Sequence, residues 1–243
     1  MKIITKRELN YLIKEEVRRQ TSRNRRRRLF ENNEKDFEID GTTLVSYHGR
    51  NITAITPDNI TSIGHGAFYN RYWLKEVIIS NGVTSISHNA FEKCYSLVSV
   101  TLPNSLTRIG DHAFDSCKRL TSITIPGSVT TIGISSFKEC YGLTSAIISN
   151  GVKEIDNFAF IDCKNLTSIN ISNSATEIDD NAFYGCSMLT SIVIPDSVTT
   201  MGDWVFKGCN NLTDIKIPEK FKDEDTLKHL GFDDIQIDTI LND

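Results

Sequence analysis

The chain has 243 residues, of which 39% are hydrophobic and 24% charged. This composition is typical of a folded globular protein and excludes a disordered polymer, a collagen and a small disulfide scaffold. The net charge of −4 is unevenly distributed, because residues 1–36 carry 12 of the 27 Lys and Arg and 6 of the 31 Asp and Glu, which gives +6 there and −10 elsewhere. The sequence therefore predicts a basic arm on an acidic body.

Residues 1–36 predict an amphipathic helix followed by an Arg-rich linker. Thr5 and Glu8 have the spacing of a capping box, so the helix is expected to begin at Lys6. Its apolar stripe consists of Leu9, Leu12, Ile13 and Val17. A cluster of arginines follows, which includes Arg23, Arg25, Arg26, Arg27 and Arg28. Three interpretations stay open: the stripe docks the chain to a larger assembly, the arginines bind nucleic acid or another polyanion, or the arm is simply solvated.

Residues 37–56 predict a capping hairpin at the front of the region that follows. Alternating apolar residues run from Phe37 to Tyr47 and are interrupted by Asp40-Gly41, a dipeptide that favours a tight hairpin turn. An open repeat stack exposes apolar surface and unpaired strand edges, so we expect this hairpin to cover one end of it.

Residues 57–221 contain seven repeats of 23 residues without insertion or deletion. The period is carried by Phe68, Phe91, Phe114, Phe137, Phe160, Phe183 and Phe206. Three residues after each Phe, from the second repeat onward, stand Cys94, Cys117, Cys140, Cys163, Cys186 and Cys209. Columns of Leu, Val and Ile keep the same period. A unit this short cannot bury its own apolar face, so successive units are expected to stack into a solenoid.

Within a unit the apolar spacing changes from three to two. Phe114, Cys117 and Leu120 step by three, which predicts one or two turns of α or 3₁₀ helix. Ser122 to Ile125 alternates polar and apolar residues, which predicts a short strand with one buried face. A second strand is expected to follow the turn at Pro126. Side-chain caps for the helical turns are expected three residues before Phe, at Asp111, Asn157, Asp180 and Asp203.

These repeats resemble the BspA-type leucine-rich repeat family. The resemblance rests on Leu120-Thr-Ser-Ile-Thr-Ile-Pro126, Val129-Thr-Thr-Ile-Gly133 and Asn181-Ala-Phe-Tyr-Gly-Cys186. It implies a leucine-rich-repeat solenoid, mostly short β-strands with short α or 3₁₀ turns. It does not specify a function, since that family contains adhesins, surface proteins and many members of unknown role.

Residues 222–243 predict a C-terminal cap. Asp223 to Leu230 reads as a short helix that ends at Gly231. Asp234 to Ile240 contains an alternating Ile-Gln-Ile segment, which predicts a last strand.

The residues that could carry chemistry fit the repeat better than an active site. No Cys-x-x-Cys pair occurs, and the six cysteines fall in one column, so we interpret them as core residues. His65, His88 and Asp111 share a column that elsewhere reads as a helix cap. No phosphate-binding loop, dinucleotide fingerprint, nucleophile elbow or metalloprotease motif is present. The sequence predicts a chain that is not an enzyme and that needs no cofactor or metal.

Two surfaces are candidates for partner binding. If the aliphatic columns point inward, the intervening strand positions line the concave side: Glu76, Ile78, Ser99, Thr101, Ser122, Thr124, Ser145, Ile147, Ser168, Asn170, Ser191 and Val193. The second is an aromatic group on the helical side of the first two units, namely Tyr69, Tyr72, Trp73 and Tyr95. Solvated Ser and Thr ladders, and aromatic packing against the arm, are the alternatives without a partner.

The sequence thus predicts a recognition or display module that binds a protein or glycan through a solenoid face. Its N-terminal helix would tether it to a larger structural assembly, of a phage or a surface type. Nucleic-acid binding through the arm is the alternative. The sequence contains no apolar run of the roughly 20 residues that a membrane span needs, and its N-terminus lacks the apolar region of a secretory signal. Unpaired cysteines suit a reducing compartment such as the cytoplasm, and a virion is compatible, so the sequence leaves the location open.

Overall fold

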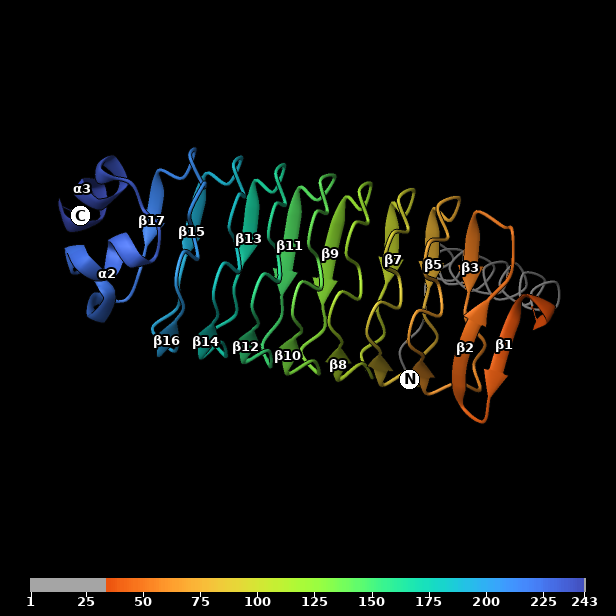
Figure 1. Ribbon diagram of the computed structural model, residues 1–243. Coiled ribbons are helices and arrows are strands. Elements are labelled where there is room, and N and C mark those ends of the chain that lie inside the picture. The colour runs from red at the N-terminus through yellow and green to blue at the C-terminus, as the bar shows by residue number, and fades with distance from the viewer. Residues whose placement is uncertain (1–33, 243) are drawn as a thin grey trace, which may run out of the picture.

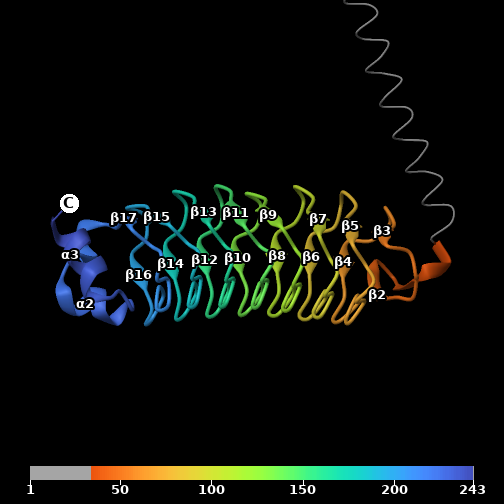
Figure 2. The same cartoon turned by 90° about the horizontal axis from the view of Figure 1, so that it is seen from above.

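The computed structural model describes residues 34–242 as one elongated solenoid (Figure 1). Seen from above in Figure 2, the coils stack along a single axis between the N-terminal strands and helices α2 and α3. Each coil has three sides: a longer strand, a two-residue strand and a segment of turns that carries the Phe and Cys columns. The predicted repeat solenoid is confirmed.

The longer strands form one side of the solenoid, called here the strand face. They are β3 (Thr53–Ile55), β5 (Glu76–Ile78), β7 (Ser99–Thr101), β9 (Ser122–Ile125), β11 (Ser145–Ile148), β13 (Ser168–Asn170), β15 (Ser191–Val193) and β17 (Asp214–Lys216). They pair in parallel as three sheets, β3-β5-β7, β9-β11-β13 and β15-β17. Equivalent residues 23 apart lie opposite each other, as Ala146 does with Ile123, so the sequence period sets the register.

The two-residue strands form a second side and one continuous nine-stranded sheet. They are β4 (Ser62–Ile63), β6 (Ser85–Ile86), β8 (Arg108–Ile109), β10 (Thr131–Ile132), β12 (Glu154–Ile155), β14 (Glu177–Ile178) and β16 (Thr200–Met201). The sheet begins with the hairpin of β1 (Phe37–Asp40) and β2 (Thr43–Tyr47), which pair antiparallel around the predicted Asp40-Gly41 turn after the short 3₁₀ helix η1 (Glu34–Asp36). The expected hairpin is therefore confirmed.

The third side consists of turns, and the prediction of short helices there is wrong. Backbone φ is positive two residues before and two residues after the repeated Phe, as at His112 (φ 53°) and Ser116 (φ 59°). This alternation aims every second N–H along the solenoid axis, so the Phe114 N–H donates to the Ser136 carbonyl in the next coil. The N–H groups between them close turns within the coil, as Ala113 does with Gly110. The N–H groups that a helix would use for its own hydrogen bonds therefore bond to the neighbouring coil.

The expected side-chain caps also bond between coils. Asp111 Oδ1 accepts the Ile134 N–H at 3.2 Å, and Asp180 Oδ1 accepts the Asp203 N–H at 2.8 Å. Asn157 differs, because its own N–H and its side-chain amide both donate to Asp156 Oδ1. These side chains therefore join coils or local loops rather than cap helices.

The core is a set of continuous files, of which the aromatic file is the longest. All seven repeated phenylalanines are fully buried, and neighbouring rings are stacked with centroids 4.7–5.9 Å apart. Tyr47 extends the file at the front and Phe232 at the back. Both caps therefore supply the aromatic side chain that the next coil would have provided.

The C-terminal cap consists of helices, and the predicted last strand is wrong. After the 3₁₀ helix η2 (Glu219–Phe221) come α2 (Glu224–His229) and α3 (Asp234–Asn242). Asp233 and Gln236 exchange hydrogen bonds of 2.9 and 3.0 Å as a capping box, which starts α3. The buried Gln236 amide also donates to the carbonyls of Cys209 and Leu212, so α3 satisfies acceptors that the last coil leaves open.

Candidate binding surface

The structure places the predicted partner-binding positions of the strands on one surface. Each of the twelve, from Glu76 on β5 to Val193 on β15, is exposed or half-buried, while the alternate positions point into the core. The middle of this strand face carries no charge, because its acidic and basic side chains stand on the outer strands, at Glu76, Asp214 and Lys216. Two aliphatic side chains interrupt the Ser and Thr ladders, since Ile147 is 48% exposed and Val193 is 56% exposed.

A slot opens in the strand face between β7 and β9. Among the described residues, no sheet pairing joins these two strands, and the same kind of break occurs between β13 and β15. A cavity of about 360 Å³ lies at the slot between β7 and β9, lined by Ser99, Val100, Thr101, Leu102, Asn104, Ser122, Thr124, Pro126, Gly127 and Ser149. The alternation along the strands does not predict this cavity. The available signal was Leu102, the one leucine in a column of isoleucines from Ile79 to Ile217.

The predicted aromatic group lies at the front of the solenoid, where Tyr69, Tyr72 and Tyr95 are exposed and also contact side chains of their own chain. Tyr69 accepts a hydrogen bond of 3.0 Å from Lys93 Nζ, which also lies over the Tyr69 ring. Tyr72, 58% exposed, stands edge-on to the half-buried Trp73 with centroids 5.0 Å apart. The group is thus only partly free to contact a partner.

A ladder of cations and rings continues from this group and was not predicted. Lys118 Nζ lies 5.2 Å from the ring centroid of Tyr95 and 5.4 Å from that of Tyr141. Lys164 Nζ also lies 5.4 Å from the ring centroid of Tyr141. Each cation–π contact joins two neighbouring coils and so helps to stabilise their stacking. The faces of these rings are therefore engaged within the chain.

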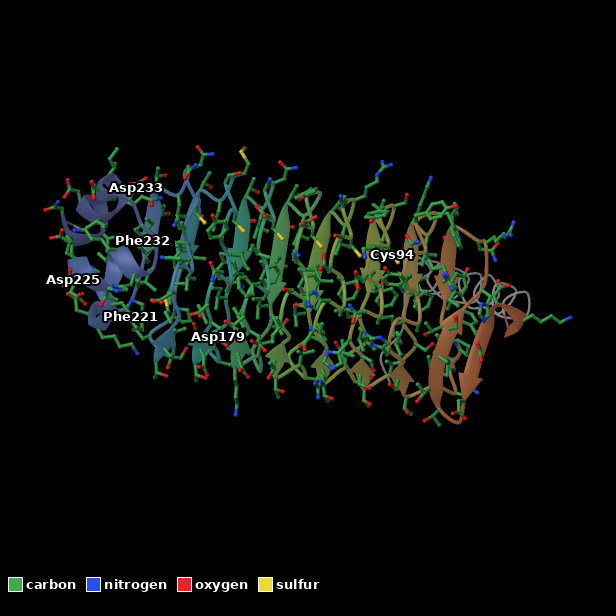
Figure 3. The ribbon with its side chains drawn as sticks, viewed as in Figure 1. Cys94, Asp179, Phe221, Asp225, Phe232 and Asp233 are labelled. Atoms are coloured by element: carbon green, nitrogen blue, oxygen red, sulfur yellow. The ribbon has the colours of Figure 1, made fainter. Side chains whose placement is uncertain are left out.

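The cysteines lie in one file in the core, as predicted, and all six are free thiols (Figure 3, where the file begins at Cys94). Each Sγ donates to the carbonyl of a Phe 26 residues earlier at 3.1–3.3 Å. Arg71, which replaces Cys in the first unit, does the same through Nε to the Tyr47 carbonyl. Burial raises the pKa of Cys94 to about 12, so this thiol is held protonated and unreactive at neutral pH.

The other polar clusters are parts of the ladders. His88 Nδ1 lies 3.1 Å from both the backbone N and Oδ2 of Asp111, and His65 is exposed in the coil before. Along β12 and β14, Glu154 pairs with Glu177, and Asp179 lies beside them. Desolvation, then Glu177 and Asp156, raise the pKa of Asp179 to about 6. Across residues 34–242, no group of three or more His, Cys, Asp or Glu is arranged to hold a metal ion.

The predicted docking stripe and the arginine cluster lie in residues 1–33, outside the described residues. Within residues 34–242, no helix has both the length and the apolar character that crossing a membrane requires.

Comparison with known families decides what kind of protein this is. A model of the BspA type leucine rich repeat region matches residues 45–163 and 130–240, with six copies of the repeat. The chain belongs to the BspA-type leucine-rich repeat family. Proteins of this family are generally non-enzymatic binding modules, so this BspA-type chain is a repeat protein of the binding and recognition kind. No curated protein matches it.

Solved structures of leucine-rich repeat proteins are similar to this BspA-type chain. The T. pallidum leucine rich repeat protein is 30% identical with a TM-score of 0.72, and the alignment covers 82% of this chain and 95% of that one. A leucine rich cell surface protein from Faecalibacterium prausnitzii A2-165 is 31% identical with a TM-score of 0.65 over 75% of this chain. The alignment covers 52% of the Faecalibacterium protein, so the present chain spans about half of it.

Proposed function

We propose that the chain is a non-enzymatic recognition module, which binds a protein or glycan through the strand face and is held in a larger assembly by residues 1–36. The observation that carries this is the uncharged middle of the strand face, with Ile147 and Val193 exposed among hydroxyl side chains. Covering such a surface desolvates no charge, and it buries two aliphatic groups that are otherwise in water.

The experiment places charge on this face and measures binding to defined probes. The probes are a random dodecapeptide library displayed on phage and an array of glycans. The double variant Ile147→Lys/Val193→Lys should weaken every selected interaction at least tenfold, since two lysines would have to be desolvated. The matched control is Ile134→Lys/Met188→Lys, which changes two side chains of similar exposure (37% and 45%) outside the strand face. Equal binding by both variants would refute the proposed face.

The tether is supported by the charge and pattern of the arm. The arm carries +6 against a body of −10, and its apolar stripe includes Leu9 and Ile13. The Faecalibacterium neighbour is described as a cell surface protein, which fits an assembly at a surface; a phage-type assembly fits the same arm. Leu9→Asp/Ile13→Asp in the full chain should release the protein from the particulate fraction of its own cells or virions. Retention of this variant would contradict the tether.

Polyanion binding through the arm is the second candidate, and the arginines between Arg23 and Arg28 favour it. Affinity for a double-stranded DNA fragment should then fall steeply between about 50 and 200 mM salt, because each neutralised phosphate releases a counterion. Replacing Arg23 and Arg25 to Arg28 by Gln should flatten that slope. Binding that is insensitive to salt would exclude this function.

A further inference from the structure

We infer that the slot between β7 and β9 anchors an extended, uncharged peptide segment of the partner. This inference rests on the proposed function and deepens it, because it assigns one subsite and one class of partner within the strand face.

The slot is a departure from the repeat, not a feature of every coil. In the two inward columns of the strand face, the members flanking this coil, such as Val77 and Ile123, are at most 3% exposed. Val100 and Leu102, by contrast, are partly exposed and form the apolar part of the cavity lining. Figure 1 shows β7 and β9 set further apart than β9 and β11. The pairing also breaks between β13 and β15, but Ile169 and Ile171 stay buried there at 9% and 6%. The break between β7 and β9 therefore differs in that it leaves inward side chains partly open to solvent.

The lining chemistry favours a peptide over a glycan. None of the ten lining residues is charged or aromatic, so the slot offers no ring on which a sugar could stack and no carboxylate to bind its hydroxyl groups. It offers instead an apolar floor, Val100 and Leu102, between the hydroxyls of Ser99, Thr101 and Ser122. An apolar side chain fits the floor, and the peptide amides beside it can bond the hydroxyl groups of the lining. Charge complementarity selects a neutral segment, because a buried charge would find no partner there.

The peptide crosses the slot and does not fill it as a new strand. β7 and β9 remain neighbours in space, whereas an inserted strand needs about 9.6 Å between them, twice the usual spacing. One side chain therefore enters the slot, and the rest of the segment lies over the adjoining strands. An extended dodecapeptide is roughly 40 Å long, enough to reach Ile147 and Val193 from the slot.

The test compares one substitution at equivalent positions of two coils. Ser122→Trp in the full chain places a large side chain at the slot, while Ser168→Trp makes the same change in the same column on β13, which is also paired on one side only but does not line the cavity. Dodecapeptides are selected on the wild-type protein from a phage library, and their dissociation constants are measured for each variant. Both serines are exposed, so both variants should melt like the wild type.

We expect the selected peptides to be neutral with one apolar anchor, and to bind Ser122→Trp at least tenfold more weakly than Ser168→Trp. Equal affinities of the two variants would refute the slot as the anchoring site. If Ile147→Lys/Val193→Lys still abolished binding, the strand face would remain the binding surface. If no such peptide were selected, and array glycans bound the wild type but not Ser122→Trp, the partner would be a glycan and the peptide assignment would be refuted.

A second variant changes the apolar floor of the slot and adds no large side chain to its outer surface. Leu102→Ile restores the isoleucine of the other coils, and Val100→Ile copies Ile123 of the next coil, so β7 and β9 should pair as β9 and β11 do. This protein should melt higher than the wild type yet lose peptide binding at least tenfold. In the wild type, hydrogen exchange of the β7 and β9 amides should slow when the peptide binds. Unchanged exchange in the bound protein would contradict an anchor at this site.

Discussion

The aromatic file makes a quantitative prediction at its centre, Phe137. Its ring is fully buried and stacked between Phe114 and Phe160, with centroids 5.2 and 5.1 Å away. Phe→Ala changes in cores cost about 3–5 kcal/mol, depending on how far the site can collapse. Hydrogen-bonded coils on both sides hold the spacing here, so the cavity left by Phe137→Ala cannot close. We expect about 4–5 kcal/mol loss in the free energy of unfolding.

Urea unfolding followed by circular dichroism measures this loss and its extent. Because each coil contacts only its neighbours, a defect at Phe137 should also uncouple the two halves and lower the slope of unfolding against urea. Phe158→Asn is the control: Phe158 is 37% exposed and holds φ 60°, which Asn adopts more readily than Phe. The free energy of unfolding of Phe158→Asn should equal that of the wild type or exceed it by up to about 1 kcal/mol. A loss below about 1 kcal/mol for Phe137→Ala, or equal losses for both, would refute the continuous file.

Three further outcomes follow from the ladders. Gly151→Ala should lower the melting temperature markedly, because Gly151 holds φ 127° and a Cβ there would overlap the Gly127 carbonyl oxygen; an unchanged melting curve would contradict that close approach. Cys94, with its pKa raised to about 12, should resist iodoacetamide at pH 8 until urea unfolds the chain, so rapid labelling of the native protein would contradict its burial. The pKa of Asp179 is raised from its ordinary value of 3.8 to about 6, so the folded state holds this proton more tightly and the group's contribution to stability falls as the pH rises through that interval. Asp179→Asn should therefore raise the melting temperature at pH 7 and leave it unchanged near pH 4, and a shift of equal size at both values would exclude the carboxylate cluster as its cause.

The elements that the sequence misassigned share one cause. The Phe-Cys-Leu spacing fits a helix, yet alternate N–H groups bond to the next coil, as Phe114 does with Ser136, and spacing within one repeat carries no information on that partner. The last segment alternates Ile-Gln-Ile like a strand, but the capping box of Asp233 and Gln236 and the open end of the last coil make it a helix. The capping box was visible in the sequence; the open carbonyls were not.

The binding surface divides in the same way. Alternation along the strands was sufficient to predict which side chains face outward, because a strand turns successive side chains to opposite faces. The slot and the Tyr95–Lys118–Tyr141 contacts depend on how far apart neighbouring coils lie, which alternation does not specify.

By itself, the sequence determined the period of 23, the in-register stacking and the contents of the core files, since units too short to fold alone must bury identical faces against each other. Only the tertiary structure decided where each backbone hydrogen bond goes, how the two ends are closed and where the strand face opens. Those features are set by distances between coils, and identical repeats leave such distances to small differences in packing, such as Val100 and Leu102.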